Sequence, residues 1–302
     1  MLAHAGWDLG PQLFAWSADP AALVLIPLAA LLYARGLASL GSRRRFHDGW
    51  RPRLFYLGLA SAFAVLVGPL DHLSGELFLA HMTQHVVLIL VAVPLVLLGA
   101  PVVPIMRGVP RALRRRALIP LLKLRLVRAF LRLISQPLVA WALFIVAFLG
   151  WHHPLAFEAA TASEAMHVLE HASFAIGAYL FWWNVVDPLP LKANLTYLAR
   201  VPYIFITVVP NFALAAFLTY ARDAWYEAYQ ASATLYGMTP LQDQQLGGVI
   251  MWIPGSFIIG TALVIDLIVA VRQEQREQLA LEAGQSPALM RSHRIVEDNE
   301  PG

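Results

Sequence analysis

Residues 81–93 read HMTQHVVLILVAV, so two imidazoles stand at the head of a long apolar run. His81 and His85 are four residues apart, which places their side chains one above the other on the same face of an α-helix. A second pair, His167 and His171 with Glu170 between them, opens another apolar run. Ionisable side chains inside such segments are costly and point to function by default. The sequence therefore predicts that fold and function meet at the polar heads of these two segments.

The composition is that of a membrane protein. Of the 302 residues, 59% are hydrophobic and 14% are charged, and the mean hydropathy of +0.61 lies outside the usual range of soluble domains. The net charge of +3 would also suit a nucleic-acid-binding protein. Because the basic residues are confined to connections between apolar runs, we expect membrane lipid and no nucleic acid as a partner. The chain has no cysteine, which excludes disulfides, thiolate metal sites and thiol nucleophiles.

Seven apolar segments are long enough to cross a hydrocarbon core of about 30 Å. We predict spans at Pro20–Leu40, Arg53–Pro69, Leu77–Pro101, Ile134–Trp151, Ala165–Val186, Ala199–Tyr220 and Gln245–Val271. The expected fold class is thus all-α, a polytopic integral membrane protein with seven transmembrane helices. Residues 1–271 are expected to form the transmembrane domain, and the polar residues 272–302 a cytoplasmic tail that is partly disordered.

Charge alternates along the connections between these segments. Residues 43–53 and 107–128 are rich in arginine, whereas residues 71–76 and 152–164 contain acids and no lysine or arginine. The positive-inside rule then places the N-terminus outside and the C-terminus in the cytoplasm. Under this topology both histidine pairs lie in the outer turns of their spans, at the same membrane depth. Residues 107–132 would also suit a helix lying on the inner leaflet, but we favour a simple positive-inside anchor.

The four residues His81, His85, His167 and His171 are the predicted metal ligands, since neutral imidazole binds zinc, copper and iron. An internal hydrogen-bond network between helices is the simpler alternative. Bound imidazoles usually need a neighbour that orients them. The expected supporting residues are His152, Glu170, Asp243, Gln84 and Met82, the last of which could equally be plain packing.

Other polar features have structural interpretations. His4, His72 and His153 are expected to be interfacial polar residues. The aromatic residues of the outer loop, Trp225, Tyr226, Tyr229 and Tyr236, are expected in the interfacial belt of the membrane. Pro94, Pro202, Pro210 and Pro254 fall inside spans, where they should free carbonyls that neighbouring helices must satisfy.

Two competing functions use the same residues. Residues 167–171 (HVLEH) match a zinc-hydrolase signature in which two histidines bind metal and the glutamate is the general base. As a five-residue pattern the match is weak, and it requires a third ligand and an open position for water. A haem-binding electron carrier is the second alternative, although one histidine from each helix would suffice for axial ligation.

Several motifs taken together resemble the multi-spanning CtaG-type assembly factors of bacterial cytochrome c oxidase, associated with the caa3-type enzyme. The resemblance extends from about the second predicted span to the seventh. It rests on residues 81–85 (HMTQH) and 98–101 (LGAP), residues 151–154 (WHHP), residues 170–174 (EHASF) and 182–183 (WW), and residues 243–248 (DQQLGG) and 251–252 (MW). Each motif is short, and their combination is what is specific.

The resemblance implies a multi-pass protein of the bacterial plasma (inner) membrane that is not an enzyme and that supports maturation of the haem-copper oxidase. It implies that copper is the metal handled by the histidine cluster, with zinc and haem as the alternatives. The implied partners are cytochrome c oxidase subunits, with a periplasmic copper chaperone as a further candidate.

Overall fold

The apolar segments fold into helices joined by short turns. The computed structural model describes residue 16 and residues 19–41, 49–187 and 190–282, and these residues include no strand, which confirms the all-α prediction for this part of the chain. The helices before residue 135 are α1 (Pro20–Leu40), α2 (Trp50–Leu66), α3 (Pro69–Ser74), α4 (Phe78–Val87), η3 (Leu88–Ala92), α5 (Val93–Leu98), α6 (Val102–Gly108), α7 (Arg111–Leu113), η4 (Arg114–Leu118), α8 (Ile119–Lys123) and α9 (Arg125–Ile134). Those after it are α10 (Pro137–Trp151), α11 (Pro154–Ala162), α12 (Glu164–Trp183), α13 (Tyr197–Thr219), η5 (Glu227–Tyr229), η6 (Ala233–Tyr236) and α14 (Pro240–Glu282).

Prolines set the first residue of many helices. A proline begins α1, α3, α10, α11 and α14. Proline suits this position because its missing N–H would have no partner in the helix and its φ angle is already helical. At α1 the preceding Asp19 completes the start, since its carboxylate accepts the backbone N–H groups of Ala21 at 2.8 Å and Ala22 at 3.1 Å.

Four helical segments in the described part of the chain are long and apolar enough to cross a membrane. They are α1, the continuous α4–η3–α5 unit, α13 and residues 240–279 of α14. A fifth candidate combines α9 and α10, which are bent by 70° at their junction. These five match the predicted spans one, three, six, seven and four. Four to five candidate membrane spans are therefore established.

The second and fifth predicted spans correspond to helices that fall short by this measure. Helix α2 has 17 residues, which is about 26 Å at the helical rise of 1.5 Å per residue. Helix α12 has 20 residues, but its first two turns include the polar side chains of His167, Glu170 and His171. Both helices nevertheless pack inside the bundle, α2 against α5 and α12 against α10.

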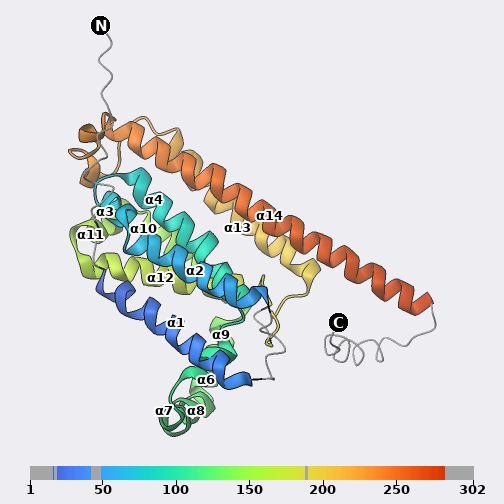
Figure 1. Cartoon of the computed structure of the whole chain (residues 1–302). Helices are drawn as coiled ribbons and strands as arrows, with labels where there is room; N and C mark the ends of the chain where they lie inside the picture. Colours follow the sequence, from blue (N-terminus) through green and yellow to red (C-terminus); the bar gives the residue numbers. More distant parts are fainter. Residues whose placement is uncertain (1–15, 17–18, 42–48, 188–189, 283–302) are drawn as a thin grey trace.

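The long helices lie side by side along one direction (Figure 1). Helix α13 packs along α14, and α14 also packs against α4. At one end of the bundle, α3, α11 and the loop between α13 and α14 come together, whereas α6 to α9 lie toward the other end (Figure 1). We call these the α3 end and the α6 end. The first turns of α4 and α12, with their histidines, lie at the α3 end.

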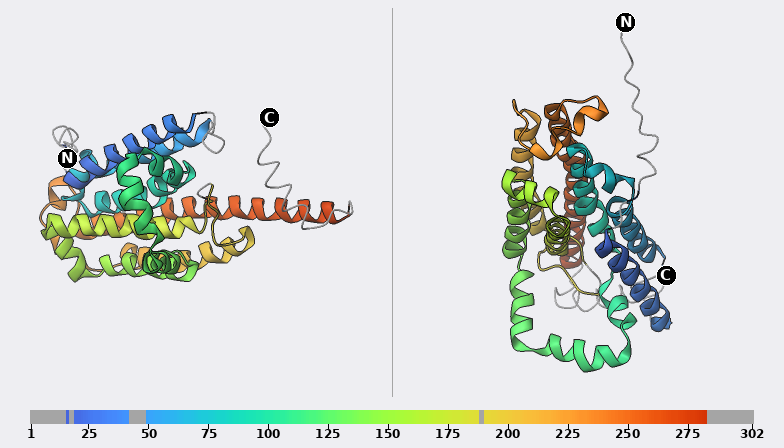
Figure 2. Two further views of the ribbon diagram at one scale, coloured as in Figure 1. Left: turned by 90° about the horizontal axis from the view of Figure 1, so that it is seen from below. Right: turned by 90° about the vertical axis from the view of Figure 1, so that its left-hand side faces the viewer.

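The basic stretch of residues 107–132 is largely helical. Its short pieces α7, η4, α8 and α9 lie outside the bundle, as a bracket below it in the right-hand view of Figure 2. On α9, Leu126 is 85% exposed and Phe130 is 59% exposed, next to arginines at 125, 128 and 132. Exposed apolar and basic side chains suit a leaflet-bound helix as well as a positive-inside anchor, so both interpretations of this stretch stay predictions.

The helix that begins with the first histidine pair contains a π-helical turn. In η3 the backbone N–H of Val93 donates to the carbonyl of Leu88, five residues earlier. The next bond of this register would join Pro94 to Ile89, but proline has no N–H. The indole Nε1–H of Trp182 on α12 instead donates to the Ile89 carbonyl at 2.9 Å. The prediction that a neighbouring helix satisfies the carbonyl freed by this proline is therefore confirmed.

Two glycines allow α14 to approach its neighbours closely. A side chain at Gly247 would meet the Phe78 ring of α4 at 2.3 Å, and one at Gly248 would meet the backbone of Thr219 at 2.7 Å. The glycine pair thus allows α14 to pack closely against both α4 and α13. Helix α14 also continues to Glu282, past the predicted span end at Val271. Residues 283–302 of the predicted tail lie outside the described residues.

Candidate metal centre

Helices α4 and α12 bring two histidines and a carboxylate together. The Nε2 atoms of His81 and His85 lie 3.5 and 3.7 Å from the two carboxylate oxygens of Glu170. One ligand atom from each of the three residues lies within 4.8 Å of the others, close enough for all three to hold one metal ion. All three side chains are buried, and Glu170 is 0% exposed. The sequence placed Glu170 in a supporting position, whereas the structure places its carboxylate between the two histidines of the first pair.

The other predicted histidines surround this trio. The His171 ring lies 5.3 Å from that of His85, and the His167 ring lies 5.5 Å from that of His81, measured between ring centroids. His152, at the end of α10, has its ring 6.5 Å from that of His85. We call the six residues His81, His85, His152, His167, Glu170 and His171 the histidine cluster. His167 is half-buried and the other members are buried.

Many polar atoms of the histidine cluster are buried without a hydrogen bond. Eight side-chain atoms of the cluster find no such partner among the described residues: Nε2 of His81, both ring nitrogens of His85 and of His171, Nε2 of His152, and both carboxylate oxygens of Glu170. A buried polar group without a partner costs free energy, so native proteins leave few of them. The concentration of eight such atoms in one place is the expected signature of a site that binds something.

Hydrogen bonds leave two of the rings with a nitrogen free for a metal. The Tyr229 hydroxyl donates to the Ser74 carbonyl at 2.9 Å and lies 3.1 Å from Nδ1 of His81. With its proton used in that way, the hydroxyl can accept only from an Nδ1–H, which leaves Nε2 of His81 with a lone pair toward Glu170. Likewise, Nδ1 of His152 donates to the Phe148 carbonyl at 2.6 Å, which leaves its Nε2 as a potential ligand.

The loop between α13 and α14, whose aromatic residues were predicted in the interfacial belt, packs over the cluster. Tyr226 and Tyr229 are each 2% exposed, so the belt prediction is wrong for these two residues. The Tyr226 ring stacks on Phe78 at 4.7 Å, and its hydroxyl donates to the His152 carbonyl at 2.9 Å. Burial raises the pKa of both phenols above the ordinary value of a tyrosine, so both remain hydroxyl donors. Both tyrosine rings are buried beside the cluster because their hydroxyl groups find hydrogen-bond partners there.

Two predicted supporting residues, Asp243 and Gln84, do not contact the histidine rings through hydrogen bonds. The carboxylate of Asp243 accepts the backbone N–H groups of Phe78 at 2.8 Å and Leu79 at 2.9 Å, so it caps the start of α4 from α14. Gln84 donates to the Val65 carbonyl at 2.6 Å and to Asp71 at 2.5 Å, facing α2 and α3. Both residues therefore position α4, and their hydrogen bonds do not involve the histidine rings.

The Trp151 motif ties α10 to α12 beside the cluster. The indole of Trp151 donates to the Ser173 hydroxyl at 2.7 Å, and that hydroxyl donates to the Glu170 carbonyl at 2.8 Å. This chain of bonds fixes the rotation of α12 that directs Glu170 inward. Of the remaining histidines, His153 is exposed and His72 lies 3.5 Å from Glu76, as expected for interfacial residues. His4, His47 and His293 lie outside the described residues.

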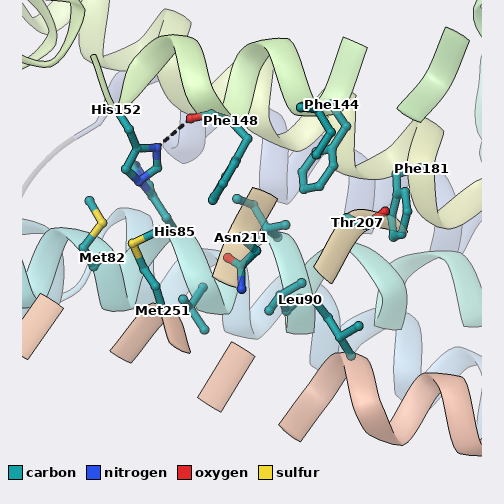
Figure 3. A pocket seen from close by; sticks show the side chains of 14 residues that line it. Met82, His85, Leu90, Phe144, Phe148, His152, Phe181, Thr207, Asn211 and Met251 are labelled. Carbon is teal, nitrogen blue, oxygen red and sulfur yellow. Dashed lines mark hydrogen bonds between the residues drawn. The ribbon is translucent and has the colours of Figure 1, made fainter. Parts of the chain in front are cut away.

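A small cavity extends from the cluster into the bundle. Its volume is about 40 Å³, and its walls include His85, His152, Met82 and Met251 at one end, and Phe144 and Phe181 at the other (Figure 3). Met82 is thus a wall residue of this cavity as well as a neighbour of His81. Asn211 of α13 also lines the cavity.

Comparison with known proteins places this arrangement in a family. A Mycobacterium bovis protein and a Mycobacterium tuberculosis protein, both described as uncharacterized, are each 25% identical over 255 residues, which is 82% of this chain. The chain spans 38% of the length of these relatives. No solved structure matches. The family model described as cytochrome c oxidase caa3 assembly factor (Caa3_CtaG) matches residues 31–273. The chain belongs to this caa3-type cytochrome c oxidase assembly factor family.

Proposed function

We propose that this protein binds copper at the histidine cluster and supplies it to a haem-copper oxidase during assembly. The observation that supports this most directly is the set of eight buried, unpaired ligand atoms around Glu170. Imidazole and carboxylate are ligands that copper accepts, and the family is one of cytochrome c oxidase assembly factors. Copper here is the cargo of the protein, and the proposed role is not catalytic.

Charge supports a cation at this position. Glu170 is fully buried, and among the described residues it has no lysine or arginine in ion-pair contact. A buried carboxylate without a compensating charge is unfavourable. A copper ion bound by His81 and His85 beside Glu170 would supply that charge, and His171 and His167 would complete the ligands from α12. His152 would support the site from α10.

The proposed topology has seven spans, with the N-terminus outside and the C-terminus in the cytoplasm. It adds α2 and α12 to the candidate spans, because α2 packs against α1 and α5, and α12 packs against α10 and α5. The alternation of basic and acidic connections supports this orientation. The histidine cluster then opens toward the outer face of a bacterial inner membrane. Oxidase subunits would dock from within the membrane, and a periplasmic copper chaperone could deliver the ion.

The zinc-hydrolase alternative assigns Glu170 a different task. A hydrolase of that type uses its glutamate as a base toward a metal-bound water, with His167 and His171 as ligands. Here the Glu170 carboxylate lies against His81 and His85 at ion-pair distance, which suits a ligand better than a base. Haem ligation would use one ring from each helix and would leave the remaining unpaired nitrogens unexplained.

The functional test is complementation of cells that lack the native protein. Variants His85→Ala and His171→Ala, shown to be present in the membrane, are expected to lose oxidase activity, whereas His153→Ala, a histidine at the same end outside the cluster, should retain it. Full oxidase activity in both cluster variants would refute the copper-delivery mechanism.

Metal content distinguishes the alternatives directly. Detergent-purified wild type is expected to contain copper, and a His81→Ala/His85→Ala variant to lose it. Zinc in place of copper would support the hydrolase, and a haem absorption band would support the electron carrier. Reporter fusions that place His152 in the cytoplasm would overturn the proposed topology.

A further inference from the structure

The cavity beside the histidine cluster combines two chemically different ligand types. His85 and His152 contribute imidazole, and Met82 and Met251 contribute thioether sulfur, at the same end of the cavity (Figure 3). These four residues come from α4, α10 and α14, so this end of the cavity forms only when three helices pack together. The rest of the cavity wall is mainly apolar.

The imidazole nitrogens at this place are available. His152 uses Nδ1–H for the Phe148 carbonyl, and its buried Nε2 has no hydrogen-bond partner in the described part of the chain. His85 is 4% exposed. Neither of its ring nitrogens has a hydrogen-bond partner in the described part of the chain. Neither nitrogen of His85 is therefore committed to a structural bond, so the ring can serve ligands on both sides.

The two methionines are buried and line the same cavity as the two imidazoles. Met82 is three residues before His85, which puts both side chains on one face of α4. Met82 is 1% exposed and Met251 is 4% exposed. Methionine sulfur beside helix contacts is usually packing, but thioethers are also soft ligands that select Cu(I). What distinguishes these two is that they share a polar-ended cavity with unpaired imidazoles.

The cavity is large enough for an ion. Its volume is about 40 Å³, whereas a cavity needs roughly 10–15 Å³ to hold a single water molecule. No lysine, arginine, aspartate or glutamate lines it, among the described residues. An apolar, uncharged surrounding with sulfur and imidazole ligands favours a monovalent ion over a divalent one, because the cost of burying charge is lower.

We propose that Met82, Met251, His152 and His85 form a second metal site, which binds Cu(I) on the inner side of the Glu170 site. The inference rests on the proposed function insofar as His85 is shared between the two sites. The ion keeps its oxidation state, so no electron donor is required. A copper ion could pass from an imidazole and carboxylate site to a thioether and imidazole site through a rotation of one shared ring.

Silver(I) is a suitable probe because it is soft, monovalent and not reduced or oxidised under the conditions of the assay. The detergent-purified full chain would be dialysed against silver(I), and bound metal measured per chain. Wild type is expected to bind one more ion than Met82→Leu/Met251→Leu. Leucine conserves the volume of methionine and usually costs less than about 1.5 kcal/mol, so the variant should fold. Met238→Leu, at another buried methionine, is the matched control.

The outcomes separate this inference from the proposed function. Loss of one ion in the methionine variant, and loss of a different ion in His81→Ala/Glu170→Gln, would support both sites. Unchanged silver binding in the methionine variant, with loss in the other, would overturn the second site alone. Loss of an ion in the methionine variant, with unchanged binding in His81→Ala/Glu170→Gln, would support the second site and overturn the cluster as the copper site. X-ray absorption at the silver edge should show sulfur neighbours in wild type that the methionine variant lacks; their absence from wild type would also overturn the proposal.

Discussion

Two groups of buried polar side chains lie in this bundle, and they differ in how completely they are paired. In the histidine cluster, eight side-chain atoms have no hydrogen-bond partner among the described residues. In the second group, the Arg200 guanidinium donates to the Val185 carbonyl at 2.6 Å and to Asp187 at 2.8 Å, and lies 3.6 Å from Asp266. Burial alone therefore does not mark a functional site. The difference between satisfied and unsatisfied polar atoms distinguishes a structural clamp from a candidate binding site.

The second group is a clamp between three parts of the chain. Arg200 lies in the first turn of α13, Asp266 belongs to α14, and Asp187 follows α12. The Tyr197 hydroxyl also donates to Asp187 at 2.8 Å, and its ring lies 4.1 Å from the Arg200 guanidinium. Each charge in this group has an opposite charge beside it. Its expected role is to hold helices together, and we order the following predictions by the loss of stability expected.

The largest loss is expected when the clamp is broken. Arg200→Met would leave Asp187 and Asp266 without their partner, and breaking a buried ion pair in this way costs about 3–5 kcal/mol. Thermal unfolding in detergent should show the loss, with Arg272→Met at an exposed arginine as the control. Copper bound per folded chain should be unchanged. An equal stability in Arg200→Met and the control would mean that the clamp is not structural.

A smaller loss is expected at the π-helical turn. Trp182→Phe keeps an aromatic ring but leaves the Ile89 carbonyl without its donor, and a buried acceptor left unpaired costs about 1–3 kcal/mol. Trp183→Phe, at the neighbouring half-buried position, tests whether the smaller side chain alone accounts for the loss of stability. The same unfolding measurement applies. If both variants lose the same amount, the hydrogen bond is not the cause.

The cap on α4 should contribute about as much as other helix caps. Asp243→Asn retains one acceptor oxygen and removes the charge, so we expect a loss of about 1 kcal/mol. Asp223→Asn, at an exposed aspartate of the outer loop, should have no effect on stability. Because the cap positions the first turn of α4, copper affinity should fall as well. Unchanged affinity in a destabilised variant would separate the cap from the site.

The smallest loss, or a gain, is expected in the histidine cluster. In metal-free protein, His85→Leu replaces an unpaired polar ring with an apolar side chain, which should be neutral or stabilising. Copper at about 100 times its dissociation constant should then stabilise wild type by about 2.7 kcal/mol and the variant far less. Thermal unfolding with a chelator measures the metal-free stability, and unfolding with copper measures the stabilisation by the metal. A large loss in the metal-free variant would instead mark His85 as a structural residue.

The sequence was most informative where a feature depends on a single helix. The spacing of His81 and His85 places both on one face, and an apolar run behind them predicts a candidate span; both hold in α4. Gln84 was expected to support the rings, but it points about a quarter turn away from His85 and donates to Val65 and Asp71 instead. Helix starts at prolines can also be predicted from the sequence, because they too depend on a single helix.

Contacts between helices were less accessible, because they depend on how each helix is rotated about its axis. Nothing in the local sequence shows that Glu170 faces His81 and His85, since this rotation is fixed by Trp151 and Ser173 on separate helices. Tyr229 was missed for a related reason. A tyrosine in a loop between two predicted spans is typical of an interfacial residue. The burial of Tyr229 depends on an acceptor at Ser74, 155 positions away.

The hydrogen bonds between Asp243 and the first turn of α4 have a consequence for biosynthesis. They join residues 165 positions apart in the chain, and the aspartate belongs to the last described helix. When both histidine pairs have left the ribosome, the cap on α4 and the hydroxyl of Tyr229 have yet to be synthesised. A nascent or truncated chain would therefore present the imidazoles without the groups that orient them. The cap on α4 therefore forms only after the first turn of α14 has been synthesised.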